Sequence, residues 1–247
     1  MSIAPPQTRE PARLGALERV PARTHGRGAG ALLSAAARRV LDILVAGTLL
    51  VALAIPMIAI AIAIRLDSDG PALFRQRRVG RGLRSFTMLK FRTMSCDADT
   101  APHRDYVRLL IEGEDNRDGD GTAPGASNGG LYKLSVDTRV TRVGAFLRAW
   151  SLDELPQLIN VLLGQMALVG PRPVIPYEVE MYPEAYLRRF AVKPGLTGLW
   201  QVSGRNERTY DEMVRFDIQY AESATLLLDL RILLKTMPVV LGRQGVA

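Results

Sequence analysis

Two adjacent acids are the residues of this sequence best suited to chemistry on phosphorus. Asp153 and Glu154 lie in the segment Ser-Leu-Asp-Glu-Leu-Pro-Gln, residues 151–157, directly before an apolar stretch. Proline is tolerated only in the first turn of a helix, so Pro156 predicts a helix that begins close to Leu152 or Asp153. The amide groups and the positive end of such a helix keep a carboxylate ionised, and an ionised aspartate can attack phosphorus as a nucleophile.

The same spacing is also typical of helix capping without any chemistry. Ser151 followed three residues later by Glu154 matches a capping box, and Asp153 could itself be the N-cap. In that interpretation both acids only satisfy backbone amide groups at the start of the helix. The residues of this segment alone leave the two interpretations open.

Catalysis at phosphorus also requires positive charge, because phosphoryl transfer is accelerated mainly by cations placed around the developing negative oxygens. Lys90, Arg148 and Arg172 are the candidates for this role. A fold that brings these side chains to Asp153 and Glu154 would form a phosphoryl-transfer site. The glutamate beside the nucleophile could then hold a metal ion or handle a proton.

The composition fits one compact domain with an anchor and favours anionic partners. The chain has 247 residues, 47% of them hydrophobic, and a formal net charge of +7. Nucleic acid, acidic lipid headgroups and phosphorylated substrates would all suit this charge. The single cysteine, Cys96, excludes an intramolecular disulfide and a cysteine-based zinc cluster and favours a reducing compartment. His25 and His103 are interpreted as ordinary exposed residues.

Residues 40–64 form an apolar run long enough to cross a bilayer as a helix, with Asp42 as the one charged residue. Both flanks are basic, since residues 1–39 hold seven Arg and two Glu and residues 65–92 hold eight Lys or Arg and two Asp. Basic flanks favour the cytoplasmic side, so the run is predicted to enter the membrane and turn back at Pro56. A spanning helix with a proline kink is the alternative that the sequence leaves open.

These features predict three parts of the chain. Residues 1–37 would be a disordered basic tail, residues 38–66 a re-entrant membrane helix and residues 67–247 a cytoplasmic catalytic domain. Within that domain, residues 112–130 are expected to form a mobile loop. The loop begins like a calcium-binding loop, but Ser127 stands where a bidentate glutamate is required, so calcium is not expected there.

The coarse secondary structure predicts an α+β protein, mostly helical with a small sheet. Residues 72–94 alternate apolar and basic side chains and predict short strands or a hairpin that turns near residues 80–82. A short helix is expected over residues 151–164 and a longer one over residues 222–241. The longer helix carries an apolar stripe that is expected to face the core, formed by Leu226, Leu230, Leu233, Leu234 and Met237.

Six segments carry a further signal. They are Gly-Pro-Ala-Leu-Phe-Arg-Gln-Arg-Arg-Val-Gly (70–80), Lys-Phe-Arg-Thr-Met (90–94), Thr-Arg-Val-Thr-Arg-Val-Gly (138–144), Ser-Leu-Asp-Glu-Leu-Pro-Gln (151–157), Leu-Val-Gly-Pro-Arg-Pro (168–173) and Lys-Pro-Gly-Leu-Thr-Gly-Leu-Trp-Gln-Val-Ser-Gly-Arg-Asn (193–206). Together and in this order they resemble the monotopic phosphoglycosyl transferases, also called bacterial sugar transferases. The resemblance covers about residues 38–246 and favours chemistry over capping for the acid pair.

The resemblance implies a two-step reaction through a covalent intermediate. Asp153 would attack the sugar-bearing phosphorus of a UDP-sugar, release UMP and hold the phosphosugar, which undecaprenyl phosphate would then accept. Glu154 would be the partner acid and, with Asp153, the site of a Mg²⁺ ion. The implied phosphate-binding residues are Lys90, Arg92, Arg148 and Arg172. The residues implied to bind the nucleotide or substrate are Arg139, Arg142, Pro171, Pro173 and Arg205.

Some of these implied roles have alternatives. A solvated or ion-paired arginine is an equal interpretation for Arg139, Arg142 and Arg205. The sequence also departs from the family pattern at two positions. Gln165 stands where an acidic residue is common, which puts in doubt a metal or hydrogen-bonding role there, and Thr138 stands where proline is common, which affects a turn.

The resemblance also implies a location and partners. The protein would be monotopic in the inner membrane, with a re-entrant helix broken near Pro56, membrane-surface helices, and both termini and the catalytic domain on the cytoplasmic side. Its partners would be a UDP-sugar, undecaprenyl phosphate and membrane lipid, and no nucleic acid, while a homo-oligomer is left open. The transferred group would be glucose-1-phosphate or galactose-1-phosphate, as the first membrane step of exopolysaccharide synthesis.

The alternative function is a non-catalytic, membrane-tethered protein whose arginines bind lipid or nucleic acid. Basic residues spread over a groove-facing helix with interleaved aromatic residues would favour that function. In this sequence the basic residues instead cluster around glycine-rich and proline-rich segments. The sequence therefore favours the enzyme.

Overall fold

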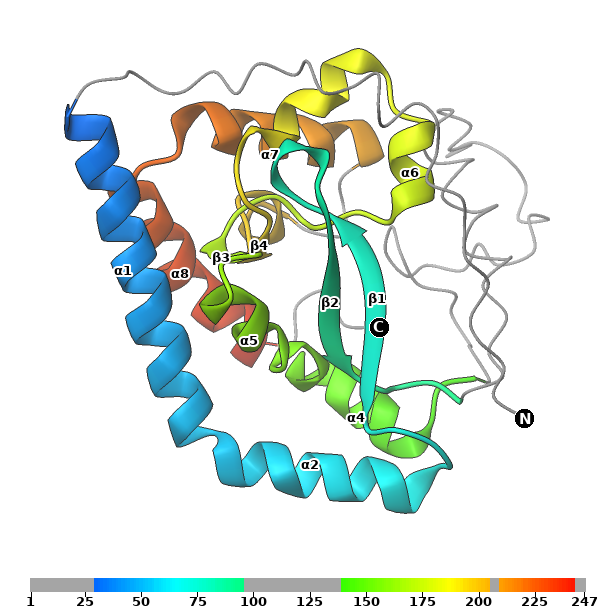
Figure 1. The fold of residues 1–247 in the computed structure, drawn as a ribbon. Coiled ribbons are helices and arrows are strands. Elements are labelled where there is room, and N and C mark those ends of the chain that lie inside the picture. Colours follow the sequence, from blue (N-terminus) through cyan, green and yellow to red (C-terminus); the bar gives the residue numbers. More distant parts are fainter. Residues whose placement is uncertain (1–28, 96–138, 205–208, 243–247) are drawn as a thin grey trace.

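The computed structural model describes residues 29–95, 139–204 and 209–242, and Figure 1 shows their arrangement. Residue 29 already begins a helix, which corrects the predicted tail boundary at residue 37. The sequence predictions that lie outside the described residues concern the tail before residue 29, the loop over residues 112–130, and Cys96, His25, His103, Thr138 and Arg205.

Two helices that meet at a sharp bend form one margin of the molecule. α1 (Ala29–Ala52) and α2 (Ala54–Asp67) are bent by 62° at the break between them, and Figure 1 shows them meeting at a corner. Pro56 cannot donate a hydrogen bond to the carbonyl of Ala52, and its ring clashes with that carbonyl, so the helix is interrupted before the proline. The predicted bend near Pro56 is confirmed, with its centre at Leu53.

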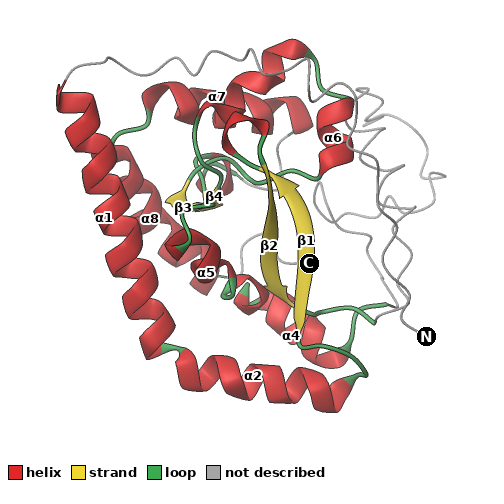
Figure 2. Cartoon of the chain, in the orientation of Figure 1, coloured by secondary structure: helices red, strands yellow, loops and turns green. Residues whose placement is uncertain are grey.

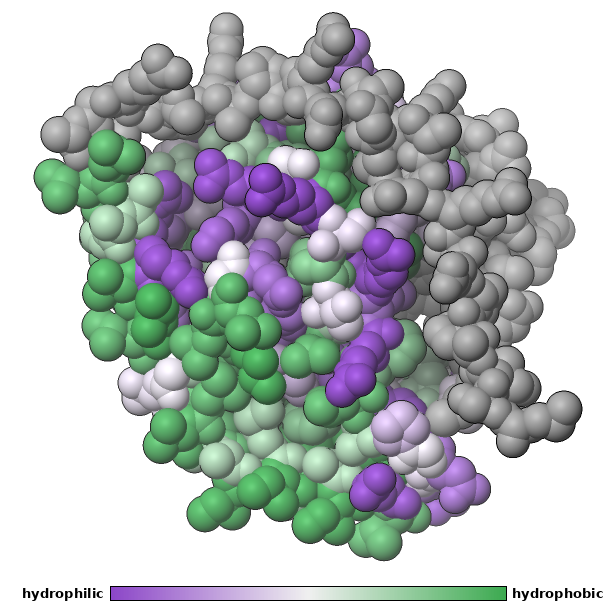
Figure 3. Space-filling view, viewed as in Figure 1, coloured by the Kyte–Doolittle hydropathy of each residue, from purple (hydrophilic) through white to green (hydrophobic). Residues whose placement is uncertain are grey.

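The outer surface of this bent pair is apolar. Within the described ranges, no helix taken singly has both the length and the apolar composition to cross a membrane, whereas α1 and α2 meet both criteria together. Many of their large apolar side chains are exposed, with Leu66 at 83% and Val51 and Ile55 at 81%. Figure 3 shows apolar surface along the margin that α1 and α2 occupy. Contiguous exposed apolar surface is typical of a face that contacts lipid or another protein.

β1 (Leu73–Val79) and β2 (Ser85–Phe91) form the antiparallel hairpin predicted for residues 72–94. Figure 2 shows this hairpin standing between helices on either side. The connection is a single 3-10 turn, η2 (Arg81–Leu83). Gly82 in this turn has a φ of +62°, a left-handed conformation that glycine adopts without a steric penalty. The hairpin and the predicted position of its turn are therefore confirmed.

A second, parallel pair of strands joins distant parts of the chain. β3 (Ala167–Val169) lies beside β4 (Gly195–Thr197), a pairing that the sequence analysis does not predict. A Cβ atom on Gly195 would lie 2.0 Å from the backbone nitrogen of Gly170, well inside van der Waals contact. The sheet therefore requires glycine here, and it fixes the start of the Gly-Pro-Arg-Pro loop, residues 170–173, that follows β3.

The other described elements are helical, which confirms the α+β class with mostly helix and little sheet. The α-helices are α4 (Arg142–Ala149), α5 (Gln157–Leu162), α6 (Pro176–Glu180), α7 (Tyr210–Ser223) and α8 (Leu226–Leu241). The short 3-10 segments are η3 (Leu152–Glu154), η4 (Glu184–Ala191) and η5 (Trp200–Val202).

The inner face of α1 belongs to the main hydrophobic core. Ala46 of α1 is fully buried in one cluster with Val161 of α5, Leu168 of β3 and Ile232 of α8. The neighbouring helix α2 contributes Ile64 to a smaller cluster. Burial of these apolar side chains stabilises the docking of the bent pair onto the rest of the protein.

Two charged side chains also fasten α1 to the domain. Asp42, the one charge in the apolar run, accepts a hydrogen bond from the backbone N–H of Leu168 at 2.9 Å. Arg39 donates to the carbonyls of Val161 and Leu162 at 2.7 and 2.8 Å, at the C-terminal end of α5. Helix C-terminal carbonyls lack partners within their own helix, so an arginine stabilises them well.

The helix predicted over residues 222–241 is one helix, α8, which begins later than expected, and part of its apolar stripe faces outward. α7 ends at Ser223 and α8 begins at Leu226, and α7 as a whole is not predicted from the sequence. Leu234 is 74% exposed, whereas Asp229 and Ile232 are buried. Asp229 accepts a hydrogen bond from the hydroxyl of Tyr220 at 2.7 Å. The expectation that the stripe packs in the core is wrong for Leu230, Leu234 and Met237, which are exposed, whereas Leu233 packs against the main core as expected.

Replacing Gly195 by alanine tests the close approach of β3 and β4. Gly195→Ala is expected to lower the free energy of unfolding by about 3 kcal/mol or more, because the added methyl group overpacks backbone against backbone. Gly47→Ala is the matched control, since nothing lies within 4 Å of its Cβ position. Denaturant unfolding in detergent measures both, and equal stability of the two variants would contradict the prediction.

Candidate functional site

Three charged side chains meet where η3 approaches β2. The ammonium nitrogen of Lys90 lies 3.0 Å from Oε1 of Glu154 and 3.8 Å from Oδ2 of Asp153. The side chain of Asp153 is 13% exposed and that of Glu154 is 27% exposed. Lys90 and Glu154 are 64 residues apart in the sequence, so the fold brings the acid pair and a predicted cation together.

The two acids stand in a separate turn and do not begin an α-helix. Ser151 has a left-handed backbone with a φ of +54°, and its side chain makes no capping hydrogen bond. η3 is a short 3-10 turn, and α5 begins only at Gln157 with Pro156 as its N-cap residue. The capping box is therefore wrong, and the helix expected to begin near Leu152 or Asp153 begins there only as the 3-10 turn η3, with the α-helix following at Gln157. A serine in this sparsely populated conformation is a strained position of the kind found at functional sites.

The surroundings of Asp153 oppose its ionisation in part and support it in part. Burial raises the pKa of Asp153 above its ordinary value, and the nearby carboxylate of Glu154 raises it further. The positive charges of Lys90 and Arg148 lower it. An ionised Asp153 is therefore weakly hydrated and stabilised by two cations, which is the condition of a reactive nucleophile.

Arg148 reaches the acid pair from the last turn of α4. Its Nε donates a hydrogen bond to Oγ1 of Thr93 at 2.9 Å. α4 lies directly on the segment after β2, since a Cβ atom on Gly144 would lie 2.2 Å from the carbonyl oxygen of Thr93. The close approach that Gly144 permits therefore sets the position of Arg148 beside Asp153.

An open hollow lies beside Lys90 and Glu154. Arg172 and Pro173, both predicted from the sequence, lie in its wall. The other polar side chains in the wall are Arg78, Gln157 and Gln201. A wall with three cations and one acid suits a ligand that carries several negative charges.

Arg78 is a site residue that the sequence analysis does not single out. It is buried, with Nη1 donating to the carbonyl of Pro173 at 3.0 Å and Nε and Nη2 donating to Oε1 of Gln76 at 3.1 and 2.7 Å. Burial lowers the pKa of Arg78 to about 10. Strand alternation would place Arg78 and Val79 on opposite faces, with only one of them buried. Both are buried, since Val79 pairs with Val174 and Arg78 bonds the neighbouring carbonyl of Pro173. Only the fold reveals this role.

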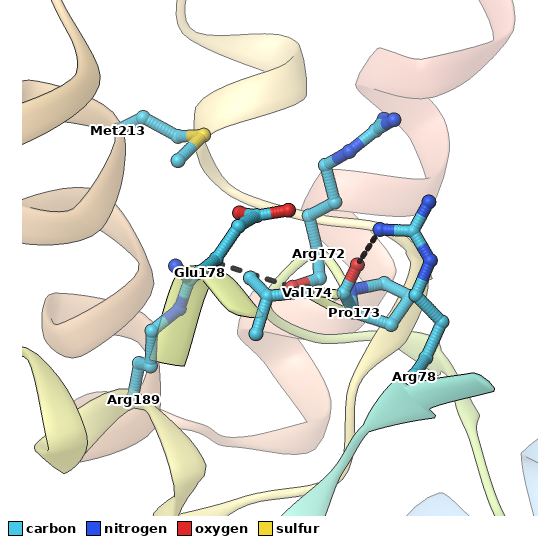
Figure 4. A pocket seen from close by; sticks show the side chains of 7 residues that line it. All are labelled: Arg78, Arg172, Pro173, Val174, Glu178, Arg189 and Met213. Carbon is cyan, nitrogen blue, oxygen red and sulfur yellow. Dashed lines mark hydrogen bonds between the residues drawn. The ribbon is translucent and has the colours of Figure 1, made fainter. Parts of the chain in front are cut away.

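A second hollow adjoins the first and shares Arg78, Arg172 and Pro173 with it. Its other polar lining residues are Glu178 and Arg189. Figure 4 shows the guanidinium groups of Arg78 and Arg172 extending to the same side of this hollow. The loop that carries Arg172 therefore lies between two polar cavities.

Arg92 does not lie in this cluster. Its guanidinium is buried and donates to the carbonyl of Ser68 at 2.7 Å, to Oγ of Ser68 at 3.0 Å and to the carbonyl of Asp69. These acceptors lie at the C-terminal end of α2. The contacts favour a structural role, holding α2 against the strand hairpin, over the predicted phosphate contact.

Three other predicted residues lie outside the wall of either hollow. Arg142 is exposed at the first position of α4, about 9 Å along the helix axis from Arg148. The carbonyl of Arg139 accepts a hydrogen bond from the backbone of Ser95 at 2.9 Å. The carbonyl of Pro171 accepts one from the backbone of Gly195, also at 2.9 Å, so Pro171 supports the contact between the two strand segments.

Gln165 serves a contact that requires only a hydrogen-bond acceptor. Its Oε1 accepts from Nδ2 of Asn160 at 2.7 Å. The same Asn160 side chain bonds the backbone of Leu89 and Thr87, at 3.0 and 2.7 Å, and so joins α5 to β2. A carboxylate at this position could accept the same bond, which explains how an uncharged residue replaces the common acid.

Comparisons with known proteins agree on one family. The family model described as bacterial sugar transferase matches residues 33–243. The chain is 42% identical over 211 residues to the galactosyl transferase CpsE of Streptococcus agalactiae, covering 85% of this chain and 43% of that protein. It is 39% identical over 210 residues to the exopolysaccharide production protein ExoY of Rhizobium meliloti, covering 85% and 87% respectively.

A third relative is named by its substrates. The chain is 43% identical over 214 residues to the UDP-glucose:undecaprenyl-phosphate glucose-1-phosphate transferase of Caulobacter vibrioides, covering 83% of this chain and 69% of that protein. The chain thus spans less than half of CpsE but most of ExoY. In all three cases the matched part is long enough to include the acid pair and the hollow beside it.

Replacing Arg92 separates its structural role from the predicted phosphate contact. Arg92→Met is expected to lower the free energy of unfolding by about 2 kcal/mol, because partly buried carbonyls just after α2 lose charged donors. Arg77→Met, on the exposed part of β1, is the control. Denaturant unfolding in detergent measures both. Unchanged stability of Arg92→Met together with weaker binding of a phosphorylated ligand would favour the phosphate contact instead.

Proposed function

Since the chain belongs to the bacterial sugar transferase family, we propose that it transfers a hexose-1-phosphate from a UDP-sugar to undecaprenyl phosphate and releases UMP. Glucose and galactose are the proposed sugars, because relatives are named as glucose and galactose transferases. The names of other relatives support a place in exopolysaccharide synthesis. The observation that carries the proposal is the buried Asp153 beside Lys90, at the edge of a hollow that two arginines line.

The reaction proceeds through two displacements at one phosphorus. In the first, an oxygen of the Asp153 carboxylate bonds to the phosphorus that carries the hexose, and the bond from that phosphorus to the bridging oxygen breaks. UMP leaves with the bridging oxygen. In the second, a phosphate oxygen of undecaprenyl phosphate bonds to the same phosphorus, and the bond to Asp153 breaks.

The cations of the site stabilise negative charge at each stage. Lys90 contacts both acids and lies at the edge of the hollow, so its ammonium group can stabilise the Asp153 carboxylate and a phosphoryl oxygen in turn. Arg148 supports the ionised carboxylate from α4. In this proposal the diphosphate lies in the hollow that Arg78 and Arg172 line. Their positive charges then neutralise the negative charge that grows on departing UMP.

We also propose a Mg²⁺ ion, held by the carboxylates of Asp153 and Glu154. Among the described residues there is no group of three or more His, Cys, Asp or Glu side chains able to hold a metal ion, so the protein would supply two ligands. Mg²⁺ is commonly bound by one or two carboxylates together with substrate phosphates and water, and this donor set therefore fits. When bound, the ion would supply positive charge to the diphosphate.

The bent helix pair supports an inner-membrane location with the site facing the cytoplasm. In this proposal α1 and α2 enter the membrane and return, while the exposed stripe on α8 lies on the membrane surface. The apolar margin, the bend and the basic flanks all favour it. The acceptor phosphate lies at the headgroup layer, so a site at that depth needs no extraction of the lipid from the membrane.

The non-catalytic alternative receives no support from these observations. Binding lipid or nucleic acid requires exposed cations, whereas Asp153, Glu154 and Lys90 form a half-buried cluster of both signs. The relatives are named as transferases and exopolysaccharide production proteins. The acid pair therefore has a use in the transferase that it lacks in a binding protein.

The proposed nucleophile is tested by changing it to its amide. Asp153→Asn is expected to lower UMP release from UDP-hexose, undecaprenyl phosphate and Mg²⁺ by at least about 10³-fold, since the amide cannot form the covalent intermediate. Mass spectrometry of wild-type protein incubated with UDP-hexose alone should find one phosphohexose on the peptide that contains Asp153. The control is Asp69→Asn, the same change at an exposed carboxylate.

Two outcomes would contradict this function. One is a wild-type protein that releases no UMP from any common UDP-hexose. The other is full turnover by Asp153→Asn, which would remove the carboxylate from the mechanism even if the reaction itself takes place.

The re-entrant topology predicts that both ends of the chain lie on the same side of the membrane. Tags at the N-terminus and at the C-terminus should both be shielded from a membrane-impermeant reagent in intact cells and labelled after permeabilisation. A spanning helix would place the two ends on opposite sides. Labelling of only the N-terminal tag in intact cells would therefore contradict the re-entrant helix.

A further inference from the structure

A fully buried ion pair adjoins the second hollow, and one of its members, Arg189, lies in the wall. Arg189 of η4 and Asp217 of α7 form a salt bridge, and each side chain is only 1% exposed. Burial raises the pKa of Asp217, and the charge of Arg189 lowers it. Removing two charges from water is costly, so a buried pair of this kind is weak evidence for stability and invites a functional explanation.

The pair contacts the main chain of Arg172. Nη2 of Arg189 donates to the carbonyl oxygen of Arg172 at 3.2 Å. The backbone of Arg172 is also among the causes that lower the pKa of Asp217. The carbonyl of Arg172 is thus bonded by the cation of the pair, and its backbone lies beside the carboxylate. Together they restrict its φ and ψ angles and the direction in which its side chain leaves the loop.

Arg189 is itself held in place. Its Nη1 donates to the hydroxyl of Tyr182 at 2.9 Å, and that hydroxyl is hydrogen-bonded to the hydroxyl of Tyr210. Tyr210 donates to Oε2 of Glu178 at 3.1 Å. The chain of contacts therefore ends at Glu178, which lies in the wall of the second hollow together with Arg172, as Figure 4 shows.

The pair of Arg189 and Asp217 supports Arg172 without lining the hollow beside the acid pair. Neither Arg189 nor Asp217 lies in the wall of the hollow beside Lys90 and Glu154, but Arg172 does. In this loop the carbonyls of Pro171 and Pro173 accept hydrogen bonds from Gly195 and Arg78, and the carbonyl of Arg172 between them accepts one from Arg189. A side chain that must meet a phosphate needs such external support.

We infer that Arg189 and Asp217 are positioning residues of the transferase, holding the backbone of Arg172 so that its guanidinium faces the substrate phosphates. The inference rests on the proposed function and deepens it. A misplacement of about 1 Å at a catalytic contact can cost about 100-fold in rate. Loss of the pair should therefore act through Arg172 alone.

A thermodynamic cycle tests this dependence. Replacing the pair by apolar side chains, Arg189→Met with Asp217→Leu, leaves no unpaired buried charge and is expected to preserve folding. It should lower kcat/KM for UDP-hexose by about 10- to 100-fold. In an Arg172→Ala background the same two changes should cost less than about 3-fold, because the group that they position is already absent.

Two further variants serve as controls. Arg188→Met with Glu222→Leu removes the neighbouring surface pair, whose side chains are 57% and 51% exposed, and should leave kcat/KM unchanged. Arg189→Lys keeps the buried charge but removes the planar fork, in which Nη2 donates to Asp217 and the carbonyl of Arg172 while Nη1 donates to Tyr182. It should lower kcat/KM in the same direction even if the apolar double variant fails to fold.

The outcomes separate this inference from the proposed function. Full activity of the variants of the pair, or equal fold-losses with and without Arg172, would overturn the inference while UMP release by the wild type still stands. If the wild type binds UDP-hexose in calorimetry but releases no UMP, the proposed function fails. The same variants are then compared by their dissociation constants for UDP-hexose in place of kcat/KM. Absence of both binding and turnover would overturn both.

Discussion

The ammonium group of Lys90 lies 3.0 Å from one carboxylate and 3.8 Å from another, and the rest of the site depends on this contact. Two adjacent acids on a short turn repel each other, and burial adds to the cost of ionising Asp153. The positive charge of Lys90, on β2, offsets both the repulsion between the acids and the cost of burial. The strand hairpin, the close packing of α4 and the left-handed Ser151 can each be understood as a means of bringing that cation and those acids together.

The arginines of the site are held by different kinds of contact. Arg78 is fixed through its own guanidinium, which bonds the carbonyl of Pro173. Arg172 is held through its backbone by Arg189, the partner of Asp217 in the buried pair. This contact sets the direction in which the side chain of Arg172 leaves the loop. Arg148 is fixed from α4 through Thr93. Arg78 and Arg172 thus line the hollow from two separate segments, and Arg148 acts on Asp153 from a third, which is how a fold with little sheet can make a rigid polar site.

The sequence allowed prediction of the local features and of the residues with unmistakable chemistry. Alternation identified the hairpin, and Pro56 identified the bend. The acid pair, Lys90, Arg148 and Arg172 were all placed together as expected. The pairing of β3 with β4 and the burial of Arg78 were missed because both depend on segments far apart in the chain. The outward stripe on α8 was missed because the partner of Asp229 lies on another helix.

The inner face of α1 has a practical consequence for handling the protein. Ala46 is completely buried, and Asp42 and Arg39 bond the backbone of β3 and α5. A truncated chain that begins after α2 would leave these backbone groups and part of the core open to water. The anchor and the enzyme are therefore one cooperative folding unit, and a detergent-free fragment is a poor route to crystals or to assays.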